Sequence, residues 1–146
     1  MRMYWRPAFL LAALASALLL PHIAPAQPAS PNPTREAVLV RQDFSDCGNA
    51  GISDADSTKV GGVVRVVRGA DGVTRVKVAM TAKRNTTYHF FLKCVRLLGD
   101  ITTQDEGEAI VEFQFPTNSV GDSFAFDMYP EGAPAGEKFQ SVPIKF

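Results

Sequence analysis

The chain has 146 residues, of which 46% are hydrophobic and 10% aromatic, and its 15 basic residues balance its 15 acidic ones. Once a leader is removed, this length encloses one hydrophobic core and leaves no room for a second domain. Charges of both signs are mixed along the chain, which argues against binding of nucleic acid through a basic surface.

Residues 1–26 have the pattern of a cleaved signal peptide. Arg2 and Arg6 precede an apolar run over residues 7–20, and small residues lead up to Ala26. We expect cleavage after Ala26 rather than an uncleaved anchor, because the run is short for a membrane span, so the mature protein should not be membrane-spanning. With no cysteine there to carry a lipid, the product should be periplasmic or secreted. It keeps 15 − 2 = 13 basic residues against 15 acidic ones, a net charge of −2.

Residues 27–35 are rich in proline and are predicted to form a linker before a single domain over residues 36–146. In that domain we expect a first strand over 36–44 and a long loop over 46–59. Cys47 and Cys94 form an even pair in an exported chain, so a disulfide is predicted, which would stabilise the fold by about 4 kcal/mol. Two buried thiols or a redox pair are the alternatives.

Residues 61–68 and 73–83 predict a β-hairpin with a three-residue loop. Gly72 ends the loop, where a left-handed conformation is required. The resulting register groups valines on the inner face and charges on the outer face. It pairs Gly69 with Val73, Val66 with Val76, Val64 with Val78, and Arg65 with Lys77.

The stretch from Asn85 to Gly99 predicts a central strand of alternating faces. Its inner face is apolar, and the outer face is more polar. Tyr88, Phe90, Leu92 and Cys94 should point inward, and His89, Phe91 and Lys93 outward.

Four more strands are expected toward the end of the chain. Residues 100–103 and 108–115 predict a second hairpin around Gly107, followed by strands over 123–129 and 139–146. Pro143 confines the last strand to an edge or a bulge. The hairpin register pairs Thr103 with Ala109, and the inward side chains are Ile101, Val111, Phe113, Phe115, Phe124, Phe126, Met128, Val142, Ile144 and Phe146.

Seven or eight short strands without helical periodicity predict an all-β fold, an antiparallel β-sandwich. Residues 82–88, Ala-Lys-Arg-Asn-Thr-Thr-Tyr, resemble the tyrosine corner of fibronectin type III and immunoglobulin-like domains. This resemblance implies an immunoglobulin-like sandwich in which the Tyr88 hydroxyl bonds to backbone near residues 82–84. Cys94 lies six residues beyond Tyr88, not two, which excludes the antibody-type core.

No catalytic, metal or cofactor site is predicted, and we expect a protein that is not an enzyme. Asp54 to Thr58 begins like a calcium loop, but Lys59 and Arg65 stand where an EF-hand needs glycine and glutamate, which excludes an EF-hand site. The two remaining alternatives for this segment are looser calcium binding and a solvated loop. His89 has no thiolate or carboxylate cluster for zinc or copper. No Gly-x-Ser-x-Gly motif accompanies it for hydrolysis.

A possible binding face is predicted on the outer strand faces. Arg65, Arg75, Lys77 and Lys93 would form a basic stripe, and Phe91 would add an exposed aromatic ring. The alternative is a solvated face that prevents aggregation. The expected function is an exported, non-enzymatic module that binds an unknown protein partner or stabilises an envelope assembly. A small-ligand or glycan binder using loops 46–59 and 130–138 is the alternative, and a secreted enzyme the third hypothesis.

Overall fold

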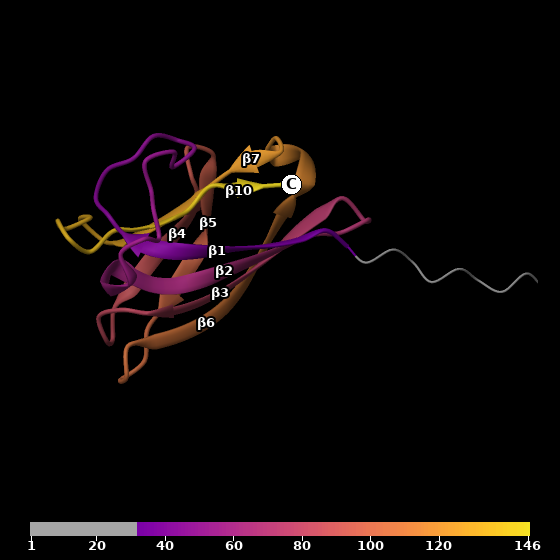
Figure 1. The fold of residues 1–146 in the computed structure, drawn as a ribbon. Coiled ribbons are helices and arrows are strands. Elements are labelled where there is room, and N and C mark those ends of the chain that lie inside the picture. The colour runs from indigo at the N-terminus through magenta and orange to yellow at the C-terminus, as the bar shows by residue number, and fades with distance from the viewer. Residues whose placement is uncertain (1–31) are drawn as a thin grey trace, which may run out of the picture. The chain divides into compact units, whose positions relative to one another are not determined.

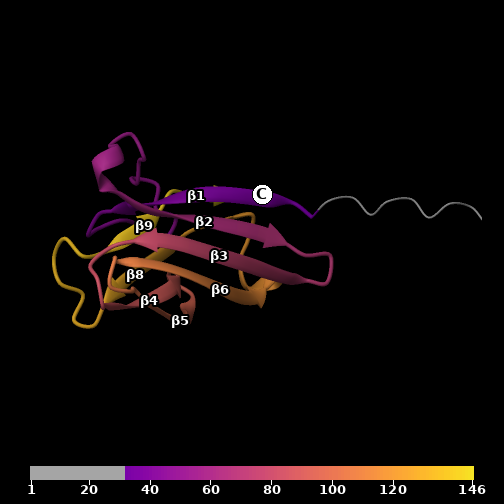
Figure 2. The same cartoon turned by 90° about the horizontal axis from the view of Figure 1, so that it is seen from below.

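The computed structural model describes residues 32–146, so the predicted signal peptide and residues 27–31 of the predicted linker lie outside the described part. That part is built of β-strands with two short 3-10 helices, η1 (Ser57–Lys59) and η2 (Thr117–Ser119). None of its helices is long and apolar enough to cross a membrane. The strands, labelled in Figures 1 and 2, are β1 (Thr34–Arg41), β2 (Val60–Arg68), β3 (Val73–Thr81), β4 (Thr87–Leu92), β5 (Arg96–Thr102), β6 (Glu108–Pro116), β7 (Ser123–Phe124), β8 (Phe126–Pro130), β9 (Phe139–Ser141) and β10 (Ile144–Lys145).

Eight of these strands form one antiparallel sheet in the order β5-β4-β8-β9-β1-β2-β3-β6. The sheet curls through 300° into a nearly closed barrel with one unsealed seam, which lies between its end strands β5 and β6. Strands β7 and β10 form a separate pair. The predicted β-sandwich, and with it the fibronectin type III or immunoglobulin-like fold, is therefore wrong.

The short strand β9 is the reason why one sheet forms where two were expected. It pairs with β8 through Met128 and Phe139, and with β1 through Leu39 and Ser141. It thereby joins the group β5-β4-β8 to the group β1-β2-β3-β6, which would be separate sheets in a sandwich. Inward and outward side chains alternate in the same way in both architectures, so the strand pattern alone does not distinguish them.

The first hairpin is confirmed in position and register. Val66 faces Val76, Val64 faces Val78, and Arg65 faces Lys77 across β2 and β3. Gly72 has a left-handed φ of 77°, and the Gly69 amide donates to the Val73 carbonyl at 2.9 Å. Local turn chemistry was sufficient for this prediction because the loop fixes the register.

The second hairpin is right in its turn and wrong in its strand pairing. Gly107 has a φ of 83°, but β6 pairs along its whole length with β3 and not with β5. Phe113 instead bridges the seam. Its ring stacks on Phe90 at 5.1 Å, and a Cβ atom on Gly99 would lie only 2.8 Å from it. A bare glycine on β5 thus gives the ring of β6 room to cover the gap.

Inward side chains fill the barrel. Phe126 and Met128 are fully buried and Phe124 is 6% exposed, as predicted, whereas Phe113 is only partly buried. Tyr88 is 1% exposed and packs edge-on against Phe139. Burial raises the pKa of the Tyr88 phenol, whereas a hydrogen bond with the backbone of Lys83 lowers it. The predicted last strand is split into β9 and β10 around Pro143.

Candidate functional site

The disulfide predicted between Cys47 and Cys94 is confirmed, with the two Cα atoms 5.6 Å apart. It ties the loop after β1 to the chain just beyond β4, and it indicates an oxidising, extracytoplasmic location. The two residues that matter most near it are Asn49, two positions after Cys47, and Lys93, directly before Cys94. The disulfide therefore brings together side chains that are far apart in the sequence.

Asn49 is fully buried, and its side chain forms hydrogen bonds where backbone pairing between two strands is interrupted. Its side-chain amide donates to the carbonyls of Phe126 at 3.1 Å and Ser141 at 2.9 Å, and the Ser141 hydroxyl accepts the Phe126 amide at 2.9 Å. These bonds lie where the β8–β9 ladder ends and the β7–β10 pair has not begun. Asn49 thus replaces the missing backbone partners of two strands.

Lys93 is held from three sides. Its ammonium donates to the side-chain oxygen of Asn49 at 2.5 Å, to that of Gln140, and to the Ser45 carbonyl at 3.4 Å. Burial lowers the pKa of Lys93, while Asp127 and Asp46 raise it. The Gln140 amide in turn donates to the Gln42 carbonyl at 2.7 Å. Lys93 therefore belongs to a polar network and is not a free surface cation.

A cavity of about 170 Å³, here called the Lys93 cleft, opens beside this network. The Lys138 ammonium lies 5.8 Å from the ring centre of Phe44 and 5.5 Å from that of Tyr129. Phe44 is 82% exposed at the rim, and Phe91 stacks on Tyr129 at 4.9 Å. The cleft is lined by Asp43, Phe44, Ser45, Lys93, Asp127, Tyr129, Lys138 and Gln140.

Two polar groups in the Lys93 cleft have unused hydrogen-bonding capacity. Within residues 32–146, no other residue donates a hydrogen bond to the half-buried Asp127 carboxylate, and the Ser45 hydroxyl is shielded from solvent without a partner. Burial raises the pKa of Asp127, while Lys93 and Lys138 lower it. Buried polar groups normally have partners, and the Asp127 carboxylate, which lines the cleft, is available to a ligand, whereas the Ser45 hydroxyl is shielded from it.

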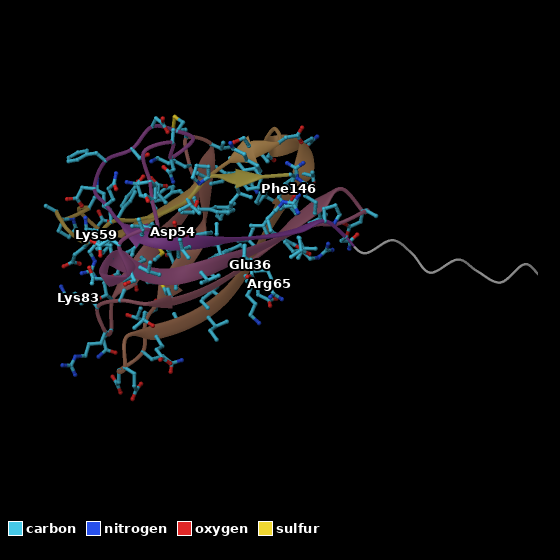
Figure 3. The ribbon with its side chains drawn as sticks, viewed as in Figure 1. Glu36, Asp54, Lys59, Arg65, Lys83 and Phe146 are labelled. Atoms are coloured by element: carbon cyan, nitrogen blue, oxygen red, sulfur yellow. A yellow bond between two sulfur atoms is a disulfide. The ribbon has the colours of Figure 1, made fainter. Side chains whose placement is uncertain are left out.

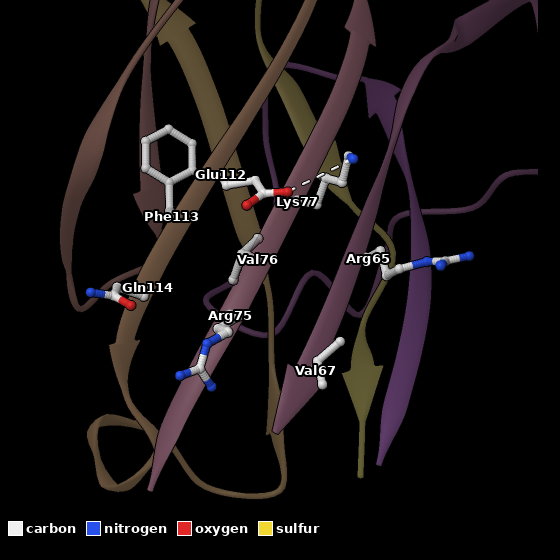
Figure 4. A pocket seen from close by; sticks show the side chains of 8 residues that line it. All are labelled: Arg65, Val67, Arg75, Val76, Lys77, Glu112, Phe113 and Gln114. Carbon is white, nitrogen blue, oxygen red and sulfur yellow. Dashed lines mark ion pairs between the residues drawn. The ribbon is translucent and has the colours of Figure 1, made fainter. Parts of the chain in front are cut away.

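The predicted basic residues of β2 and β3 lie together over an open groove of about 520 Å³ (Figure 4). Each of them has an acidic partner, so the groove carries little net charge. Figure 3 shows Arg65 beside Glu36 on the same side of the barrel. The ion pairs join Arg65 to Glu36 at 2.6 Å, Arg75 to Asp71 at 2.6 Å, and Lys77 to Glu112 at 3.7 Å.

The residues of the predicted binding face do not form a single surface. Phe91 and Lys93 belong to β4 and its end, and three strands, β8, β9 and β1, separate β4 from β2 in the sheet. The face divides into a charge-paired groove that contains Arg65, and the Lys93 cleft with its neighbour Phe91.

His89 lies between two carboxylates on the outer side of β4. Its Nδ1 is 2.7 Å from Asp100 and its Nε2 is 3.2 Å from Glu131, and both raise its pKa. The carboxylates approach opposite ring nitrogens and do not converge on one point. Within the described residues, no three His, Cys, Asp or Glu side chains form a group that could hold a metal ion.

The calcium-like segment is engaged in local bonds. Asp56 caps the 3-10 helix η1, accepting the Thr58 amide at 3.1 Å and its hydroxyl at 2.6 Å, and Lys59 is 3.7 Å away. The Asp56 oxygens thus have nearby donors already, as in an ordinary capped turn.

Asn49, Asp127, Phe44 and Lys138 were not identified from the sequence. Asp127 did leave a signal, because it is the only charged residue in the apolar run Phe124 to Pro130. Asn49 left a weaker signal, because it lies two residues after Cys47, which was predicted to form the disulfide. Lys138 ends loop 130–138, one of the two loops predicted for the alternative ligand-binding function, although it was not singled out as a residue. Phe44 gave no signal, because loop packing alone brings it to the cleft.

Fold and sites together define a single-sheet antiparallel barrel with a disulfide-clamped loop and an external cleft. In comparisons with known proteins, no family model and no curated protein matches the chain. Its function is therefore inferred from its own residues.

Proposed function

We propose that this protein is an exported, non-enzymatic binding module of the periplasm or the cell exterior that holds a protein partner, or part of an envelope assembly, on the outer face of its barrel. Side chains fill the interior, so a partner meets the outside of the sheet. His89 has carboxylates at both ring nitrogens, which argues against its use as a general base.

One aliphatic row carries this proposal. Val38, Val63, Ala79 and Ile110 are cross-strand neighbours on the outer side of β1, β2, β3 and β6. Val63 is 39% and Ile110 is 69% exposed. Four strands at about 4.8 Å spacing give the row a length of about 14 Å. A contiguous apolar strip of this kind is typical of protein-binding surfaces.

The surroundings of the row favour a protein over an anionic polymer. In the next row of the sheet, Glu36, Arg65, Lys77 and Glu112 pair with each other. This row offers both signs of charge, as the polar rim of a protein interface does. An open groove of about 350 Å³ beside the aliphatic row is lined by Val60, Ala79 and Ile110 among others.

Site-specific photo-crosslinking in the cells that export the protein tests this proposal. A photoreactive residue at Ile110 is expected to give a discrete protein adduct, and one at Glu106 in the exposed turn between β5 and β6 is the matched control. Ile110→Lys should abolish adducts from a probe at Val63 without changing the melting temperature, because the Ile110 side chain is largely exposed. Equal adducts from both positions, or none from Ile110, would contradict the proposal.

The Lys93 cleft favours a second function, the binding of a small polar ligand between loops 42–59 and 131–138. The Asp127 carboxylate supports it, because this group lines the cleft and a ligand could supply the hydrogen bonds that the other described residues do not.

A further inference from the structure

We infer that the Lys93 cleft binds one neutral sugar residue, either free or at the end of a glycan. The inference rests on the second proposed function, small-ligand binding at this cleft. It follows from the charge balance, the unused hydrogen-bonding groups, the aromatic rings and the size of the cleft.

The charges of the cleft cancel. Two carboxylates, Asp43 and Asp127, stand against two ammonium groups, Lys93 and Lys138. An anionic ligand would meet the carboxylates and a cationic one the ammonium groups, and neither would gain net attraction. A neutral ligand avoids this penalty.

The free polar groups suit hydroxyls. The Asp127 carboxylate lines the cleft and can only accept hydrogen bonds. Lys138 has a flexible stem and adds donors at the rim. A ligand that satisfies both groups must donate to the carboxylate and accept from the ammonium over a short distance, which is the property of neighbouring sugar hydroxyls.

Aromatic rings border the same space. Phe91 stacks on Tyr129 at 4.9 Å and 20°, which holds the Tyr129 ring in place, and Phe44 is exposed at the rim. The electron-rich face of an aromatic ring attracts weakly positive C–H groups. Phe91 and the Lys138 ammonium already cover the Tyr129 ring, so the C–H face of a sugar packs on the exposed Phe44 ring while its hydroxyls reach the polar groups.

Size and rigidity limit the ligand to one ring. The volume of about 170 Å³ is below the roughly 300 to 1,000 Å³ of sites for drug-sized ligands. The cleft is also preorganised, because the disulfide and Asn49 fix one loop and the Gly136 amide donates to Asp43 at 2.9 Å to join the second. A preformed site loses less entropy on binding.

Nuclear magnetic resonance titration of the exported protein tests the inference. The probes are glucose, galactose, mannose and N-acetylglucosamine, with glucosamine and glucuronic acid as charged comparators. We expect saturable shifts of the Ser45, Asp127 and Tyr129 amides with at least one neutral sugar, and weaker ones with the charged sugars. No saturable shift with any neutral sugar, or tighter binding of a charged one, would overturn the inference.

Asp127→Asn should weaken binding of that sugar about tenfold or more, since it replaces a charged acceptor. It should not lower the melting temperature, because no other described residue donates to this carboxylate. Asp105→Asn in the exposed turn between β5 and β6 is the matched control and should leave binding unchanged. Unchanged binding by Asp127→Asn would overturn the inference. Shifts from a non-sugar ligand at the same amides, with all sugars silent, would leave the second function standing and reject the sugar.

Discussion

Asn49 joins three parts of the molecule through one side chain, the clamped loop, the break between β8 and β7, and Lys93. Its amide group uses both ends, donating to two strand carbonyls and accepting from an ammonium group. Its left-handed φ of 54° is one that asparagine tolerates better than most residues. The residue thus satisfies both its backbone conformation and its buried surroundings.

Asn49→Ala should lower the free energy of unfolding by about 3 kcal/mol, because two buried carbonyls lose their side-chain donor and Lys93 loses one of its three acceptors. Asn85→Ala is the matched control, since Asn85 has a similar φ of 50° but is exposed. Its expected cost is about 1 kcal/mol. Urea unfolding of both variants checks this, and equal losses would show that the buried bonds contribute nothing.

His89 gives the stability a pH dependence. Two carboxylates raise its pKa above the ordinary value of 6.5, so the folded state binds the proton more tightly than the unfolded state. The stabilisation is therefore complete below about pH 6.5 and is lost as the pH rises through the raised pKa. His89→Gln should lower the melting temperature at pH 5.5 and leave it unchanged at pH 9. A loss that is equal at both pH values would contradict the role of the proton.

Among the elements, those set by neighbouring residues were predictable and those set by distant ones were not. The β2–β3 hairpin follows from its turn, and the Gly107 turn follows in the same way. The choice of β3 as the partner of β6 depends on residues that are more than 25 positions away in every pair. A turn specifies only the first residue pair after it, and packing decides whether the two strands continue as partners or separate.

Strand β9 shows the same limit in stronger form. It has three residues, all buried, between a glycine-rich loop and Pro143, so no alternation of faces is visible in the sequence. Its pairing with β1 and β8 nevertheless changes a sandwich into a barrel. The Lys93 cleft shares this origin, because its residues come from four separate segments. The disulfide, the outward side of Phe91 and Lys93, and the use of loop 130–138 could be predicted, but the side chains that meet in the cleft could not.

At the scale of the whole molecule, one curved sheet separates two candidate surfaces. The aliphatic row crosses β1, β2, β3 and β6, and the Lys93 cleft lies outside β4 and β8 under the two loops. A protein partner on the row and a sugar in the cleft can therefore be tested independently. Failure of crosslinking from Ile110 would reject the partner surface and leave the sugar titration unaffected.

This separation depends on the closure of the sheet through β9, which a direct distance measurement tests. Nuclear Overhauser contacts between the backbone protons of Val40 and Gln140, and of Leu39 and Ser141, are expected because these residues are cross-strand neighbours. A two-sheet sandwich would place β1 and β9 in different ladders. Absence of these contacts in an otherwise assigned spectrum would contradict the single-sheet barrel.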